Sequence, residues 1–65
     1  MTLGEKLREI RKQKDLTKQE LGVSLNVSKD RIKLYEIGEE EPSDFYLTAF
    51  AQHFDIPVED LLSFK

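Results

Sequence analysis

The chain has 65 residues, of which 35% are charged, and a formal net charge of −3 at pH 7. A chain of this length folds as one small domain, so we expect residues 1–65 to form a single unit. The absence of cysteine excludes a disulfide framework and a thiolate site and favours a reducing compartment, here the cytoplasm. No apolar run is long enough to span a bilayer or to act as a secretory signal, so we expect a soluble, unprocessed chain without membrane contact.

The charges are divided unevenly between the two halves of the chain. Residues 1–33 hold nine Lys or Arg and five acids, a net charge of +4, whereas residues 34–65 hold one Lys and eight acids, a net charge of −7. This asymmetry indicates one basic face suited to a polyanion and one acidic end that points elsewhere. Composition alone fits two solvated surfaces equally well, so the function must be argued from motifs.

The first predicted helix begins after Thr2. Thr2 and Glu5 form a Thr-x-x-Glu capping box, and apolar residues then recur at spacings of four and three as far as Ile10. The pattern predicts an amphipathic helix that ends near Lys14, with Asp15 in the turn that follows it.

Two short helices and a tight turn are predicted over residues 16–38. Thr17 and Glu20 form a second capping box ahead of an eight-residue helix, which Asn26 closes because Asn readily takes a left-handed backbone. Ser28 is a good N-cap for the next helix, and Gly38 supplies its left-handed exit. The spacing of helix, turn and helix is typical of a helix-turn-helix.

The helix from Lys29 to Ile37 divides into two faces when its residues are laid out at about 100° per step. One side, with Arg31 at its edge, carries the packing residues Ile32, Tyr35 and Glu36. The other side is presented to solvent and carries Lys29, Asp30, Lys33, Leu34 and Ile37.

Two more helices follow in the acidic half. Ser43 caps a fourth helix that runs to about Phe54, and its stripe of Leu, Phe and Ala at helical spacing indicates core packing rather than a cofactor site. Pro57 suits the start of a final short helix with an apolar seam. The elements together predict an all-α fold of five helices.

The chain closely resembles the phage-repressor and Cro-type (XRE-like) helix-turn-helix family along nearly its whole length. The resemblance runs from LGEKLREIRKQKDLT to IPVEDLL and is clearest over LTKQELGVSLNVSKDRIKLYEIG. It implies a lambda-repressor-like, compact five-helix bundle with a central helix-turn-helix. It also implies a repressor-like transcriptional regulator that binds double-stranded DNA sequence-specifically as a homodimer. The helix from Lys29 to Ile37 would enter the major groove, and two copies would read half-sites about 34 Å apart.

Carried over by position, the resemblance assigns three groups of residues. The base-reading group lies on the presented face and consists of Lys29, Asp30, Lys33 and Leu34. The phosphate group lies at helix starts and consists of Thr17, Lys18 and Ser28. The dimer candidates lie at the end of the chain and are Val58, Leu61 and Phe64, for which an intramolecular lid over the core is the equal alternative.

Arg11 flanks the packed face of the first helix. The resemblance implies that it pairs with Glu36, and an Arg fork binds a carboxylate bidentately, so the role would be architectural. The alternatives are a solvated Arg11, and a pair between Lys33 and Glu36 one helical turn apart.

The chain departs from the family pattern at several positions. Asp15 stands where the family usually has Gly, and Gly22 stands where it prefers Ala and permits a close approach to the next helix. Asp44 occupies a usually apolar position, for which Phe45 or Tyr46 should compensate.

The largest departure is the acidic loop, Glu39, Glu40 and Glu41, where relatives often carry Lys or Arg close to the DNA backbone. Acids there would repel phosphate and lower affinity, unless the loop simply faces water. Leu34 and Ile37 place two large apolar side chains beside this loop. That pairing leaves open an alternative function, a protein-interaction module on the same fold.

The sequence gives no support to catalysis. His53 is the only His, and the Ser residues are assigned to helix caps. The sequence therefore offers no set of nucleophile, base and orienting residue of the kind that hydrolases use. No residues have metal-ligand spacing, and no Gly-rich loop precedes a helix. We therefore expect no enzyme activity, no metal and no cofactor.

Overall fold

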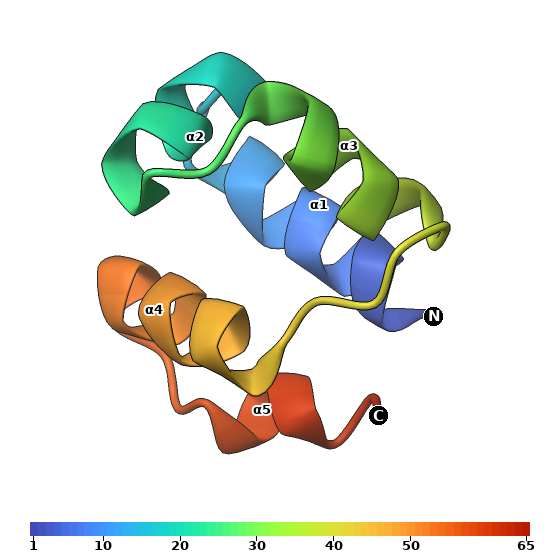
Figure 1. The fold of residues 1–65 in the computed structure, drawn as a ribbon. Helices are drawn as coiled ribbons and strands as arrows, with labels where there is room; N and C mark the ends of the chain where they lie inside the picture. The colour runs from blue at the N-terminus through green and yellow to red at the C-terminus, as the bar shows by residue number, and fades with distance from the viewer.

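Five α-helices and no strand make up the computed structural model, which describes residues 1–65 (Figure 1). The helices are α1 (Leu3–Gln13), α2 (Lys18–Leu25), α3 (Lys29–Ile37), α4 (Asp44–Phe54) and α5 (Glu59–Leu62). In Figure 1 α1, α2 and α3 form an upper layer, and the segment after α3 leads down to α4 and α5. The all-α prediction is confirmed. None of the helices is both long and apolar enough to cross a membrane.

Four of the five helices begin at a side-chain cap, as the sequence predicts. Both capping boxes form: Thr2 Oγ1 accepts from the Glu5 N–H at 3.2 Å, and the Thr2 N–H donates to Glu5 Oε1 at 2.7 Å. Thr17 and Glu20 repeat this geometry at the start of α2. Serine caps begin α3 and α4, whereas α5 has no side-chain cap. Each cap satisfies N–H groups that have no partner inside the helix.

Left-handed residues end or follow four helices and turn the chain. Asn26 and Gly38 were predicted to take this backbone and have φ values of 58° and 84°. Asp15, which stands where the family usually has Gly, has a φ of 57°. Asp55, at 57°, ends α4 in the same way and was not predicted. After α1 the Leu16 N–H donates to the Arg11 carbonyl at 3.2 Å, so Leu16 folds back against the core.

The core is one cluster of 11 buried side chains drawn from all the helices. It includes a row of tilted aromatic rings, in which the ring centroids of Tyr35 (α3) and Tyr46 (α4) lie 4.7 Å apart. The row continues through Phe50 and Phe54, whose ring centroids lie 4.6 Å apart. Tyr46 is buried and Phe45 is 85% exposed, so Tyr46 alone compensates for the polar Asp44.

Two glycines permit close approaches to α3. An ideal Cβ on Gly4 would lie 2.5 Å from the carbonyl oxygens of both Tyr35 and Glu36, at the end of α3. A Cβ on Gly22 would lie 2.4 Å from the Val27 carbonyl oxygen in the turn before α3. Because real Cβ contacts are longer than this, a side chain at either position would push its helix away from α3 or from the turn before it.

Candidate nucleic-acid interface

The two faces predicted for α3 are present in the structure. Ile32, Tyr35 and Glu36 are buried against the rest of the fold. Lys29, Asp30 and Lys33 are exposed on the opposite side. Two apolar side chains share this exposed side, Leu34 at 36% exposure and Ile37 at 57%. The helix therefore offers a mixed polar and apolar surface that no other element covers.

The start of α3 is fixed by the turn that precedes it. The Val27 N–H donates to the Gly22 carbonyl at 2.9 Å, and the half-buried Val27 packs against the core. Ser28 Oγ then accepts from the Arg31 N–H at 3.2 Å. Lys29 and Asp30 thus follow a turn whose backbone has little freedom, and their side chains leave the molecule in a defined direction.

The end of α3 is fixed by the predicted pair between Arg11 and Glu36. Arg11 Nε donates to Glu36 Oε2 at 2.7 Å and Nη2 donates to Oε1 at 3.0 Å, with both side chains about 95% buried. Arg11 Nη1 also donates to the Leu16 carbonyl at 2.7 Å, which ties the turn between α1 and α2 to the same group. Lys33 makes no ion pair with Glu36, so the competing pair does not form.

The three residues assigned to phosphate contacts lie at the starts of α2 and α3. Thr17 Oγ1 and Ser28 Oγ each accept one backbone N–H, which leaves each hydroxyl hydrogen free to donate outward. Lys18 is half-buried in the first turn of α2. Free donors and positive charge at helix N-termini suit a phosphate group.

The acidic loop is held in place by ion pairs. Glu40 Oε2 lies 3.5 Å from Arg31 Nη1 without forming a hydrogen bond, and Glu41 lies 3.8 Å from Lys65 Nζ. Lys65 also donates to Asp44 at 2.6 Å, and this hydrogen bond raises the pKa of the Lys65 ammonium. Glu39 is exposed and unpaired. The description of the loop as simply solvated therefore fits Glu39 and the Glu41 side chain, which is 73% exposed, and fails at the half-buried Glu40.

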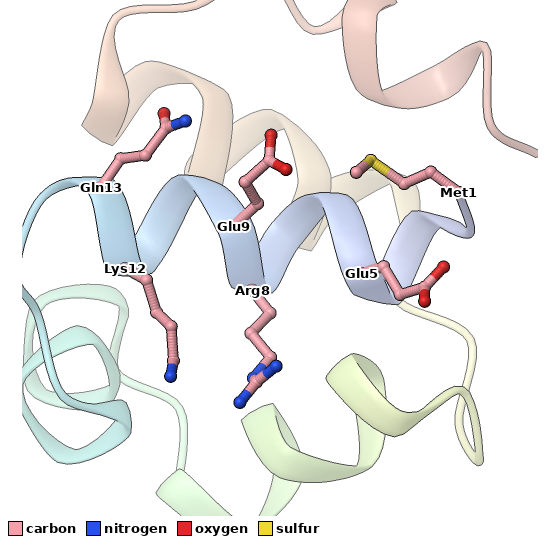
Figure 2. A pocket seen from close by; sticks show the side chains of 6 residues that line it. All are labelled: Met1, Glu5, Arg8, Glu9, Lys12 and Gln13. Carbon is pink, nitrogen blue, oxygen red and sulfur yellow. The ribbon is translucent and has the colours of Figure 1, made fainter.

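Two cations on α1, Arg8 and Lys12, are not among the site residues predicted from the sequence. Figure 2 shows Arg8 and Lys12 projecting from α1 toward α2 and α3, whereas Glu9 and Gln13 point to the opposite side. A signal was available, because Arg8 and Lys12 are one helical turn apart and adjoin Arg11 in sequence. The net positive charge of residues 1–33 also pointed to a basic face, without assigning it to these residues.

The dimer candidates differ in accessibility. Leu61 is 0% exposed and belongs to the core of the protomer, so the expectation that it contacts a second copy is wrong. It acts instead as the intramolecular lid that was the alternative. Val58 is half-buried and Phe64 is 36% exposed, so these two side chains still reach the surface.

The structure groups no three or more His, Cys, Asp or Glu side chains around a common point that could hold a metal ion. His53 is exposed at the end of α4, and its ring meets the Phe54 ring edge-on at 4.8 Å. Its position in the last turn suits the helix dipole.

The sequence matches a family model, and the fold is similar to a solved structure. The family model described as helix-turn-helix matches residues 7–61. Among solved structures, the chain is similar to the P22 c2 repressor protein in complex with synthetic operator 9T in the presence of Tl+. The TM-score is 0.88 and the identity 28%, over 100% of this chain and 98% of that chain. This likeness confirms the predicted repressor-like arrangement of five helices. A comparison with curated proteins finds no match.

Proposed function

Because the chain belongs to the helix-turn-helix family, we propose that it binds double-stranded DNA sequence-specifically as a repressor-like transcriptional regulator. The observation that carries this proposal is the fixed, uncovered face of α3. Its start is held by the Ser28 cap and its end by the pair between Arg11 and Glu36. The similarity to a repressor in complex with a synthetic operator supports the same ligand.

In this proposal α3 is the recognition helix and lies in the major groove. Lys29, in its first turn, donates to guanine O6 or N7, and Asp30 accepts from cytosine N4. Leu34 packs against a thymine methyl group. Lys33 reaches a base or a phosphate, while Thr17, Lys18 and Ser28 position the helix on the backbone.

We further propose that the protein acts as a homodimer in the cytoplasm. One recognition helix spans only a few base pairs, and two copies on a two-fold axis read half-sites about 34 Å apart. Val58 and Phe64 are the accessible candidates for the contact between copies.

Selection of bound sequences from a random duplex pool tests both parts of the proposal. The expected result is an enriched inverted repeat with half-sites about 10 base pairs apart. A single enriched half-site would retain DNA reading and remove the dimer. A pool without enrichment would remove sequence-specific reading.

A protein-interaction module on the same fold is the second candidate. It is favoured by Ile37, 57% exposed, and Leu34, which lie beside the acidic loop. Retention on heparin at neutral pH and low salt separates the two functions, because a DNA-binding face is held by a polyanion despite the net charge of −3. Failure of heparin to retain the protein would favour the interaction module.

A further inference from the structure

Four cations from three helices form a continuous basic strip along one side of α3. We use the name basic strip for Arg8 and Lys12 of α1, Lys18 of α2 and Lys33 of α3. Arg8, Lys18 and Lys33 line one surface depression. Arg8, Lys12 and Lys18 line the next one, so the two depressions share Arg8 and Lys18.

The cations of the basic strip have no acidic partners. The five ion pairs of the protein engage Lys6, Arg11, Arg31 and Lys65. No member of the basic strip is among them. Lys14 and Lys29 are also unpaired, but only the members of the basic strip line shared surface depressions, where several unpaired cations are available together to an external anion.

Three acids line the same depressions, and only one of them, Glu36, is neutralised by an ion pair. Glu36 accepts two hydrogen bonds from Arg11, and Glu5 accepts the Thr2 N–H at 2.7 Å. Asp15 is exposed in the turn after α1. The depressions therefore present mainly unpaired positive charge.

The basic strip and the acidic loop lie on opposite sides of the presented face of α3. Lys33 is close in helical angle to Glu36, the residue that faces α1 through Arg11. Arg31 is at the other edge, where it pairs with Glu40 of the loop. A helix in the major groove has a phosphate backbone on each side, and only the side toward α1 is basic here.

We propose that the basic strip binds consecutive backbone phosphates of the DNA strand that borders the groove on the α1 side, with Arg8 at its centre. This inference rests on the proposed function and extends the DNA surface beyond the helix-turn-helix to α1. Arg8 supplies a planar fork that matches phosphate oxygens bidentately, and the lysines supply point charges on either side of it. Lys33 belongs to this phosphate group and does not read a base.

The salt dependence of binding tests the inference. Each phosphate contact contributes about 0.9 to the slope of log K against log salt concentration. Arg8→Gln removes one contact, so the ratio of its affinities at about 50 mM and about 200 mM salt should fall three- to fourfold below that of wild type. The loss should be equal for the selected site and for mismatched duplexes. Lys33→Gln should behave as Arg8→Gln does.

Lys14→Gln is the matched control. Lys14 carries the same charge at the C-cap of the same helix, is exposed, has no ion pair and lines neither depression. Its substitution should leave the slope unchanged. Arg8 is exposed, so its variant should melt as wild type does, and a melting curve verifies this.

Two results would overturn the inference and are distinguishable. If wild type binds the selected duplex and Arg8→Gln keeps the wild-type slope, the basic strip is not a phosphate site, although the proposed function stands. If wild type binds no duplex, the proposed function and the inference both fall. Specificity lost at one base pair in Lys33→Gln would return Lys33 to the base-reading group and overturn its assignment here.

Discussion

The guanidinium of Arg11 donates two hydrogen bonds to the carboxylate of Glu36, at 2.7 and 3.0 Å, and both groups are buried. The pair joins α1 to the end of α3. Removing either partner leaves the other charge buried without compensation, so Arg11→Met and Glu36→Gln should each lower the free energy of unfolding by about 3 to 5 kcal/mol. Chemical denaturation measures this, and for so small a domain the loss approaches the whole stability.

The pair of Lys6 and Glu9 is the control for this prediction. Its atoms are 3.9 Å apart and both side chains are substantially exposed, so Glu9→Gln should cost less than about 1 kcal/mol. If Glu36→Gln proved no more costly than Glu9→Gln, the buried pair would not be what fixes α3.

Lys29 and Lys18 should differ in what their loss does to DNA binding. Lys29→Ala should relax preference at one base pair of each half-site and weaken the best site by about 1 to 3 kcal/mol. Lys18→Ala should weaken all sequences alike because it contacts only the backbone. Titrations on matched and mismatched duplexes compare the two, and equal losses on every duplex would remove Lys29 from the base-reading group.

The acidic loop should weaken binding to every duplex. Replacing Glu39, Glu40 and Glu41 with Gln removes charges that repel phosphate and also frees Arg31 from its pair with Glu40. Affinity should rise for all sequences, and the gain should be larger at about 50 mM than at about 200 mM salt because salt screens the repulsion.

Glu59→Gln combined with Asp60→Asn controls for net charge, because both residues are exposed on α5. The gain in DNA affinity for each charge removed should be smaller in this α5 variant than in the loop variant. A loop that docks a protein would behave otherwise: the Gln variant would keep wild-type DNA affinity and lose a partner captured by wild type.

Gly4→Ala should destabilise the fold although Ala is the better helix former by about 1 kcal/mol. The new methyl group would meet two backbone carbonyl oxygens of α3 at 2.5 Å, and backbone cannot swing aside as a side chain does. We expect a net loss of about 1 to 3 kcal/mol, typical of overpacking. Thermal denaturation decides the sign, and a variant more stable than wild type would show that α1 shifts away from α3 at little cost.

Tyr46 should make stability fall at high pH. Burial raises the pKa of its hydroxyl above the ordinary value, and the negative charges near it on Tyr35 and Glu36 act in the same direction. Since the folded state holds the proton more tightly, the stabilisation is complete below about pH 10 and is lost as pH rises beyond it, by at most about 1.4 kcal/mol per pH unit. Tyr46→Phe should flatten this alkaline decline in urea denaturation curves. A decline of equal slope in the variant would assign it to other groups.

The features that the sequence predicted well are local ones. Both capping boxes, the left-handed Asn26 and the buried face of α3 depend on residues within a few positions of one another, and these interactions favour one geometry. The pair of Arg11 and Glu36 is not local, and only the family resemblance suggested it. The structure supplied its bidentate geometry and the third bond, to Leu16.

The features that the sequence did not predict depend on how the helices are placed. Leu61 has the pattern of a surface seam residue as much as that of a core residue, and only the packing of α5 on the core shows that it is buried. Arg8 and Lys12 become candidates for DNA contacts only because their side chains project toward α2 and α3, and the sequence does not show on which side of α1 those helices lie. The side chains of Glu40 and Arg31 come together because the chain turns at Gly38. The helical periodicity of the sequence cannot predict such a contact, because Glu40 lies beyond the end of α3.

The contact between the Tyr35 and Tyr46 rings has a spectroscopic consequence. The chain has no Trp and only these two Tyr, and their centroids lie 4.7 Å apart across the boundary between α3 and α4. Tyrosine emission and the near-ultraviolet circular dichroism of the tyrosine band therefore report on the contact between α3, the recognition helix, and α4. If the near-ultraviolet tyrosine signal were lost while the helix content stayed constant, α3 would have separated from α4 before the molecule unfolds. This measurement needs no attached label.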